Sequence, residues 1–223
     1  MSKLKDALKV RDRWKQILLS HKAIAVIRSP NLETGWEMAQ AVAQGGIKSI
    51  EIAWNSDRPE ELVTKLRQEL PERTVGVGTI LELQELQKAI ACGAQFVFSP
   101  HLNADLLRTA VEDYGIPIIP GALSPTEIVT AWQLGASAVK VFPIQAVGGA
   151  NYIKSLQAPL GQISLIPTGG ITLENAPAMI SAGAIAVGLS SQLFPKSLVE
   201  AKDWQAITQR TKALLTSLNL SVN

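Results

Sequence analysis

The sequence predicts an α/β fold, a (β/α)8 TIM barrel with an extra N-terminal helix. Short, continuously apolar segments recur about every 20 to 26 residues, which is the length of one strand-and-helix unit. A helix-period segment precedes most of them and ends at a glycine, a residue that takes a positive φ without a Cβ clash. The glycines that show this pattern are Gly46, Gly93, Gly115, Gly135 and Gly183.

The predicted strands are continuous apolar runs, as expected for parallel strands that are buried on both faces. Eight such strands with seven connecting helices favour a closed barrel, with a doubly wound open sheet as the alternative. We place the strands at Ala23–Ile27, Ser49–Ala53, Val75–Gly78, Phe96–Ser99, Pro117–Pro120, Ala138–Phe142, Ser164–Pro167 and Ala184–Val187.

Two further helices are expected at the ends of the chain. Lys3–His21 leads into the first strand, and Asp203–Asn219 follows the last one, with Asp203 as its N-cap. A length of 223 residues suits one barrel, and no linker or low-complexity tract interrupts it. The sequence therefore predicts a single domain over residues 1–223.

Composition narrows the classes of function. With 47% hydrophobic and 18% charged residues the chain is expected to fold, and a net charge of +2 without a basic cluster argues against nucleic-acid binding. No apolar run is long enough to span a membrane. The spaced charges of the first residues do not form a signal peptide, and Cys92 is the one cysteine, expected to be a small buried hydrophobe. We expect a cytoplasmic protein that acts on a small molecule.

Lys140 is the most informative residue. The active site of such a barrel lies at the carboxyl ends of its strands, and Lys140 interrupts the apolar run AVKVF of the sixth strand. Burial lowers the pKa of a lysine, and the neutral amine can attack a ketone to form an imine. The alternative is that Val139 and Val141 face the interior while Lys140 extends outward between helices.

Glu51 is the second candidate. It interrupts the apolar run SIEIA of the second strand, and a carboxyl group with a raised pKa could shuttle the protons that imine chemistry needs. The alternative is a purely structural ion pair between Glu51 and Lys140.

The loops after the seventh and eighth strands predict an anion site. They hold Gly169 and Gly170 before a helix with the sequence LENAPAMI, and then Gly188 and Ser190. Glycine-rich loops in these places bind phosphate through backbone N–H groups. Arg28, at the end of the first strand, suits the capture of a carboxylate, unless it is a solvated charge at the rim. No residues have the spacing of metal ligands or of a dinucleotide motif, so we predict neither metal nor cofactor.

The chain resembles the 2-keto-3-deoxy-6-phosphogluconate (KDPG) and 4-hydroxy-2-oxoglutarate (KHG) aldolases from end to end. The resemblance is carried, in order, by AVIR, GGIKSIEI, VGVGTI, GAQFVFSPHL, IPGALSPTEI, GASAVKVFP, PTGGIT and AGAIAVGLSS. It implies a class I aldolase on a (β/α)8 barrel, usually a homotrimer, that cleaves a phosphorylated keto acid to pyruvate and glyceraldehyde 3-phosphate.

The resemblance also implies roles for single residues. Lys140 stands at the Schiff-base lysine and Glu51 at the general acid/base. The pyruvate half is lined by Thr79, Thr168 and Phe142, with Pro100 among the substrate-binding positions, and the phosphate loops hold Gly169, Gly170, Gly188 and Ser190.

Two departures from the family pattern bear on the substrate. Some members hold the pyruvate carboxylate with an arginine four residues after the glutamate, where this chain has Asn55; others carry it at the end of the first strand, as Arg28. We therefore assign the carboxylate to Arg28. Leu189 stands where many members have glycine or serine, and is expected to narrow the phosphate pocket. Asn55-Ser56 resembles the galactonate-type branch of the family and Thr168 the gluconate type.

Other functions remain open on the sequence alone. The chain could be a 2-keto-3-deoxy-6-phosphogalactonate aldolase, or a phosphate-binding barrel of another class, such as an epimerase or a thiamin-phosphate synthase. A catalytically silent barrel is a third possibility, against which the presence of both Lys140 and Glu51 argues.

Overall fold

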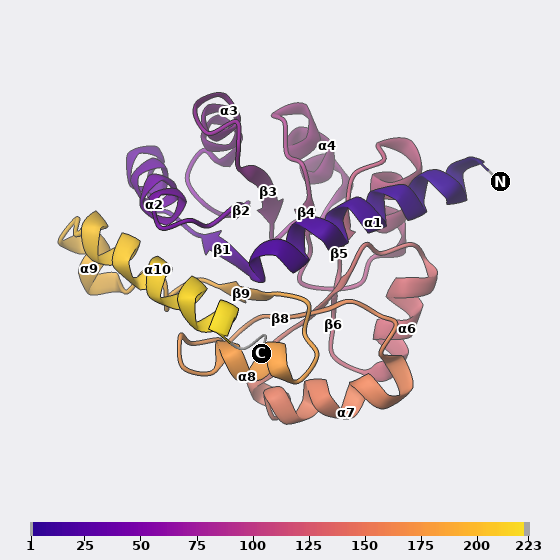
Figure 1. Ribbon diagram of the computed structural model, residues 1–223. Coiled ribbons are helices and arrows are strands. Elements are labelled where there is room, and N and C mark those ends of the chain that lie inside the picture. The colour runs from indigo at the N-terminus through magenta and orange to yellow at the C-terminus, as the bar shows by residue number, and fades with distance from the viewer. Residues whose placement is uncertain (1, 221–223) are drawn as a thin grey trace.

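The computed structural model describes the backbone of residues 2–220 and the side chains of residues 10–218. Parallel strands form the centre of the molecule, and helices surround them (Figure 1). The strands are β1 (Ala23–Ile27), β2 (Ser49–Ala53), β3 (Thr74–Gly78), β4 (Val97–Phe98), β5 (Ile118–Ile119), β6 (Gly121–Ala122), β7 (Val139–Val141), β8 (Leu165–Pro167) and β9 (Val187–Leu189).

The helices follow the strands in alternation. They are α1 (Ser2–His21), α2 (Leu32–Gln44), α3 (Pro59–Glu69), α4 (Leu83–Ala91), α5 (Ala104–Arg108), α6 (Pro125–Gln133), α7 (Ala150–Leu160), α8 (Ala176–Ser181), α9 (Lys196–Glu200) and α10 (Trp204–Leu220), with single turns η1 (Thr109–Asp113) and η2 (Ile144–Val147).

The strands pair as two parallel sheets, in the orders β5-β4-β3-β2-β1-β9 and β6-β7-β8. Only Pro120 separates β5 from β6, and the Pro120 carbonyl accepts a hydrogen bond from the Lys140 backbone N–H at 2.9 Å. At the other edge an isolated parallel bridge joins Thr168 to Gly188. Hydrogen bonds therefore connect the second sheet to β9.

The predicted strands agree with the structure to different degrees. β1 and β2 have the predicted bounds. The predicted fifth strand, Pro117–Pro120, contains only β5, and a separate strand, β6, follows Pro120, because proline has no backbone N–H for a continuous ladder. The prediction of Ala184–Val187 as the last strand was wrong, since β9 begins at Val187, where pairing with Ala23 starts. Its glycine at position 188 was interpreted as the start of a loop.

The strands separate two apolar clusters. The larger lies between strands and helices and includes Val139 and Val141, while the smaller lies on the opposite strand faces and includes Phe96 and Phe98. Trp14 of α1 belongs to the smaller cluster, with its ring centroid 4.6 Å from that of Phe96. Helix α1 therefore covers the end of the strands at which β1 begins, and leaves the carboxyl ends for a site.

Local features confirm the predicted helix ends. The five glycines that were expected to end helices all have a positive φ. Asp203 caps α10 as predicted, since its Oδ1 accepts a hydrogen bond from the Ala206 N–H at 2.9 Å. The thiol of Cys92 is half-buried and donates to the Ala89 carbonyl; burial raises its pKa to about 11. Among the described residues, no helix is long and apolar enough to cross a membrane.

Helix α10 packs closely on α2 at Gly45. A Cβ at this position would lie 2.5 Å from the Cβ of Thr211, a fully buried side chain of α10. The Thr208 hydroxyl donates to the Ala41 carbonyl at 2.9 Å, which fixes the two helices at this distance. The last helix is thus held against the first unit of the fold by a contact that leaves no room for a methyl group.

We predict that Gly45→Ala lowers the free energy of unfolding by about 1–3 kcal/mol, because the added methyl group overpacks this contact. Chemical denaturation measures the change. The neighbouring Gln44→Ala is the control, because Gln44 is exposed and its shortening removes no buried contact. Equal stabilities of the two variants would show that the helices separate without cost.

Candidate active site

One cavity of about 350 Å³ lies at the carboxyl ends of the strands. Every residue that the sequence predicted for the site lines it. Those residues are Arg28, Glu51, Thr79, Pro100, Lys140, Phe142, Thr168, Gly169, Gly170, Gly188 and Ser190. Segments that are far apart in the sequence therefore meet here, as the rule for strand ends in parallel barrels predicts.

Lys140 points into this cavity from the middle of β7. Its neighbours Val139 and Val141 pack in the cluster between strands and helices, so the outward orientation considered from sequence is wrong. The side chain is 7% exposed, and Nζ lies 4.7 Å from the centre of the Phe142 ring and 5.9 Å from that of Phe98. Burial lowers the pKa of the amine, which the charge of Glu51 partly opposes.

Glu51 enters the same cavity from β2 and is 3% exposed. Its carboxylate lies directly over Gly78, where a Cβ would come within 1.7 Å of Oε1. Burial raises the pKa of Glu51, while the charges of Lys140 and then Arg28 lower it. No ion pair joins Glu51 to Lys140 in the part of the chain that the structure describes, although the charge of each group shifts the pKa of the other.

Two threonines extend the polar lining. Thr79 follows β3 with a φ of 64°, an unusual conformation for a β-branched residue and one that is held by its surroundings. The Oγ1 of Thr168 is buried and has no hydrogen-bond partner among the described residues. A buried hydroxyl without a partner is costly, and a ligand in this cavity could satisfy it.

Arg28 and Asn55, the two residues considered for a substrate carboxylate, contact each other. The Arg28 Nε donates to the Asn55 Oδ1 at 3.0 Å, and only Arg28 lines the cavity. The loops that carry them are joined as well, because the Ser56 Oγ accepts from the Ser29 N–H and the Ser29 carbonyl accepts from the Asp57 N–H. Asn55 therefore binds one edge of the guanidinium group and leaves the other nitrogens available.

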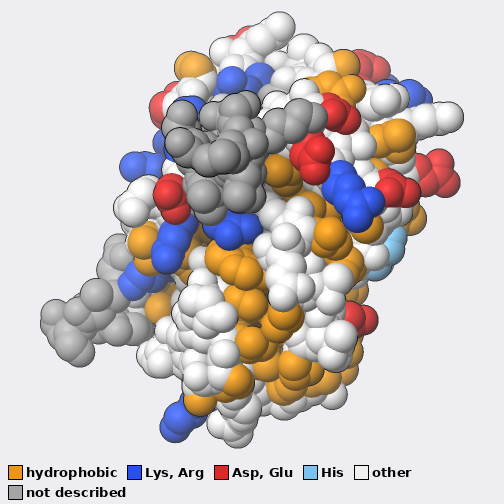
Figure 2. Space-filling view, turned by 90° about the vertical axis from the view of Figure 1, so that its right-hand side faces the viewer, with side chains coloured by type: hydrophobic (Ala, Val, Ile, Leu, Met, Phe, Trp, Pro, Cys, Tyr) orange, Lys and Arg blue, Asp and Glu red, His pale blue; other side chains and the backbone are white. Residues whose placement is uncertain are grey.

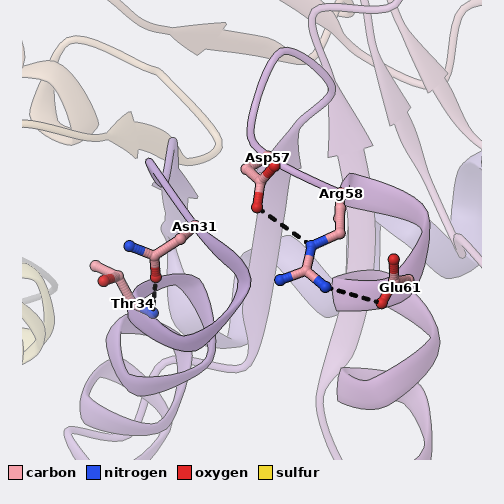
Figure 3. Close-up of polar contacts among 5 residues, drawn as sticks. All are labelled: Asn31, Thr34, Asp57, Arg58 and Glu61. Atoms are coloured by element: carbon pink, nitrogen blue, oxygen red, sulfur yellow. Dashed lines mark hydrogen bonds and ion pairs between the residues drawn. The ribbon is translucent and has the colours of Figure 1, made fainter.

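The next turns anchor these loops to their helices (Figure 3). Asn31 caps α2 by accepting a hydrogen bond from the Thr34 N–H at 2.8 Å. At the start of α3, the Arg58 Nε donates a hydrogen bond to the Asp57 Oδ2 at 3.3 Å, and the Arg58 Nη1 lies 3.5 Å from the Glu61 Oε2. The mouth of the cavity beside Arg28 is thus built on helix ends that polar contacts hold in place.

The glycine loop after β8 is fastened by one side chain. The Asn175 Nδ2 donates to the Gly170 carbonyl at 2.9 Å, and its Oδ1 accepts from the Thr172 N–H at 2.8 Å. The helix predicted over LENAPAMI starts later than expected, because α8 begins at Ala176, after the turn that Asn175 closes. Gly169 and Gly170 both have a positive φ, at 84° and 87°.

Sequence reasoning missed some of the lining. Four of the missed residues lie one or two positions after a predicted residue, and this proximity was the available signal. Val26 instead lies two positions before Arg28, on the same strand face. The missed residues are Val26, Ile171, Thr172, Ser191 and Gln192. Leu189 was predicted to narrow the phosphate pocket, and this was wrong: it packs in the cluster between strands and helices and does not line the cavity.

Other places offer less chemistry. A cavity of about 380 Å³ lies beneath α1, but Arg13 is the one charged side chain in its lining. His101, to which no role was assigned, lies outside the cavity that holds Lys140. Within the described residues, no group of three or more histidine, cysteine, aspartate and glutamate side chains is placed to hold a metal ion.

A parallel α/β fold with a buried amine and a buried carboxyl group in one cavity is the organisation of enzymes that work through an imine. Comparison with known proteins makes the assignment specific. The model of the KDPG and KHG aldolase family matches residues 15–210, and the chain belongs to this family.

Individual relatives agree. The 2-dehydro-3-deoxy-phosphogluconate aldolase of Dickeya dadantii is 34% identical over 199 residues, which cover 87% of this chain and 93% of that protein. The KHG/KDPG aldolase of Escherichia coli K12 is 31% identical over 93% of this chain and 99% of its own. The KDPG aldolase of Legionella pneumophila, solved with pyruvate as a covalent carbinolamine, is similar in structure, with a TM-score of 0.83, 27% identity, and coverage of 90% of this chain and 97% of its own.

The opposed charges in the cavity predict a pH-dependent stability. Replacement of Lys140 by methionine removes the cation that most lowers the pKa of Glu51, so that pKa rises further above its ordinary value. The stability that neutral Glu51 contributes is complete below the ordinary pKa of glutamate and is lost as the pH rises through the raised pKa. We expect the free energy of unfolding of Lys140→Met to fall as the pH rises from the ordinary pKa of glutamate through the raised pKa of Glu51.

Denaturation across this range measures the effect, with Lys140→Met/Glu51→Gln as the matched control. The double variant cannot ionise at position 51 and should lack this fall. The same slope in both variants would place the titrating group elsewhere.

Proposed function

We propose that this protein reversibly cleaves KDPG to pyruvate and glyceraldehyde 3-phosphate through an imine on Lys140. The observation that carries the proposal is the buried Lys140 amine, which faces the same cavity as Glu51 without forming an ion pair with it. Membership of the KDPG and KHG aldolase family supports the reaction class, that of a carbon–carbon lyase.

The chemistry follows from the two groups. The neutral Lys140 amine adds to the C2 ketone, and the neutral Glu51 carboxyl group donates the proton with which the carbinolamine loses water, which leaves a protonated imine and a Glu51 carboxylate. Glu51 accepts the proton of the C4 hydroxyl as the C3–C4 bond breaks, and the electron pair moves to the imine to give an enamine. After the aldehyde leaves, protonation at C3 and hydrolysis release pyruvate and restore the amine.

Burial prepares both groups for these steps. It lowers the pKa of Lys140, so more amine is neutral, and it raises the pKa of Glu51, so this carboxyl group can return the proton it has taken. Arg28 further lowers the pKa of Lys140 through its charge.

The two ends of the substrate would contact different parts of the cavity lining. At the pyruvate end we assign the carboxylate to Arg28, with Thr79 and Thr168 as donors beside it and with Pro100 and Phe142 as apolar walls. The loops after β8 and β9 would bind the phosphate, through Gly169, Gly170, Gly188 and Ser190.

Substrate range goes beyond this assignment. The E. coli relative is named for both KHG and KDPG, so we propose 4-hydroxy-2-oxoglutarate as a second substrate. The galactonate epimer stays an alternative, since the same imine chemistry cleaves it. A panel of the three keto acids, followed by pyruvate release, separates these substrates.

The architecture that we propose is a single-domain, closed (β/α)8 barrel. Its support is that Pro120 alone interrupts the chain between the two sheets on one side, while the Thr168–Gly188 bridge joins them on the other. Counting β5 and β6 as one strand makes eight, with α1 as the extra helix. We further propose a homotrimer, as the family resemblance implies; apolar side chains gather on the lower part of the face that carries α6 and α7 (Figure 2). A cytoplasmic location stays a prediction.

Covalent trapping tests the proposal directly. Borohydride with pyruvate should leave a three-carbon adduct on Lys140, and Lys140→Ala should lose both the adduct and KDPG cleavage. Peptide mass mapping locates the adduct, and the exposed Lys48 serves as the control, since Lys48→Ala should keep both. An adduct on another lysine, or none, would contradict the proposal.

The carboxylate assignment has its own test. Arg28→Ala should weaken pyruvate binding by about 2–4 kcal/mol, because a carboxylate in a partly desolvated site loses its charged partner. Imine formation should be slower as a result. Asn55→Ala should cost much less, since it removes only a support of Arg28. Pyruvate trapping rates measure both effects.

A rescue variant sharpens this comparison. Asn55→Arg in the Arg28→Ala background should restore part of the rate, because it recreates the other arrangement in the family. If Arg28→Ala behaves like the wild type while Asn55→Ala is crippled, neutral donors hold the carboxylate and the assignment is wrong.

A further inference from the structure

The part of the cavity that is formed by the loops after β8 and β9 has backbone donors but no cation. Among the described residues, the N–H groups of Gly170, Ile171, Ser190 and Ser191 have no hydrogen-bond partner, and all four residues line the cavity. The charged residues of the lining come from other strands: Lys140 from β7, which pairs with β8, Arg28 from the end of β1, which pairs with β9, and Glu51 from β2. The residues that these two loops themselves contribute to the lining are all neutral.

Arg210 of α10 is placed directly behind these loops. Its Nε and Nη2 both donate to the Gln192 carbonyl, at 3.1 and 2.8 Å, in partly buried hydrogen bonds. Gln192 lines the cavity next to Ser190 and Ser191. Two hydrogen bonds from one planar guanidinium group to a single carbonyl fix the position of this loop more firmly than one bond would.

Arg210 also acts on the loop after β8. Its charge contributes to the lowered pKa of Glu174, for which the hydrogen bond from the Thr172 hydroxyl is the largest cause. Thr172 lines the cavity, and its N–H is held by Asn175, which also binds the Gly170 carbonyl. Arg210 thus contacts the loop after β9 through its hydrogen bonds, and its charge acts on Glu174 of the loop after β8.

We propose that Arg210 is a positioning residue that sets the preference of this enzyme for phosphorylated over unphosphorylated keto acids. It holds the Ser190–Gln192 loop in place through the Gln192 carbonyl. From outside the cavity lining, its guanidinium group also supplies the positive charge that the lining residues of these loops lack. The inference rests on the proposed function, and it concerns a residue outside the cavity lining.

The test compares two substrates in Arg210→Met, which keeps the apolar stem but loses the guanidinium group. The KM for KDPG should rise about tenfold, as expected for loss of an interaction that involves a charged group, while the KM for 4-hydroxy-2-oxoglutarate stays near that of the wild type. Arg210→Lys should recover part of the loss, since it restores the charge but not the paired hydrogen bonds.

Lys212→Met is the matched control, because it removes the same charge from an exposed position on the same helix. It should leave both KM values unchanged. An equal rise for both substrates in Arg210→Met would mean a general structural role, and an unchanged KM for KDPG would mean no role; either result overturns the inference.

Binding of inorganic phosphate, measured by calorimetry, separates this inference from the proposed function. Arg210→Met should weaken phosphate binding about tenfold relative to Lys212→Met, whether or not the protein cleaves KDPG. Equal affinities overturn the inference. Failure of the wild type to trap pyruvate would overturn the proposed function alone.

Discussion

The burial of one amine and one carboxyl group in the same cavity is the constraint on which the rest of the structure depends. Lys140 and Glu51 interrupt strands that are otherwise apolar, and neither has an ion-pair partner among the described residues. Such groups are costly to bury, and the packing of the surrounding strands has to supply that free energy. The valines on either side of Lys140 contribute, because they pack against the helices while the lysine faces inward.

Backbone geometry then decides where these groups can lie. Gly78 leaves space for the Glu51 carboxylate, and the Pro120 carbonyl accepts a hydrogen bond from the Lys140 backbone N–H. Asn55 holds the guanidinium group of Arg28 by accepting a hydrogen bond from its Nε. Each of these contacts joins neighbouring strands or the loops that follow them. The site is therefore as rigid as the strand pairing itself, and rigid placement of reacting groups lowers the barrier of a reaction.

Much of this arrangement could be predicted because it follows from local patterns and from one general rule. Apolar continuity located β1 and β2, and the rule that sites lie at strand ends selected the cavity lining. The bounds of β9 could not be predicted, because Gly188 suits both a strand and a loop. The orientation of Leu189 and the contact of Arg210 with Gln192 depend on tertiary packing, which leaves no periodic trace in the sequence.

The position of α1 over one end of the strands affects how ligands enter and leave the enzyme. Trp14, Phe96 and Phe98 pack together on that side, and the cavity that holds Lys140 lies at the opposite, carboxyl ends of the strands. With the imine on Lys140 as proposed, pyruvate stays tethered at the inner end while the aldehyde is free to depart. Release is then ordered by the architecture: the phosphorylated aldehyde leaves first, and the tethered fragment follows after hydrolysis.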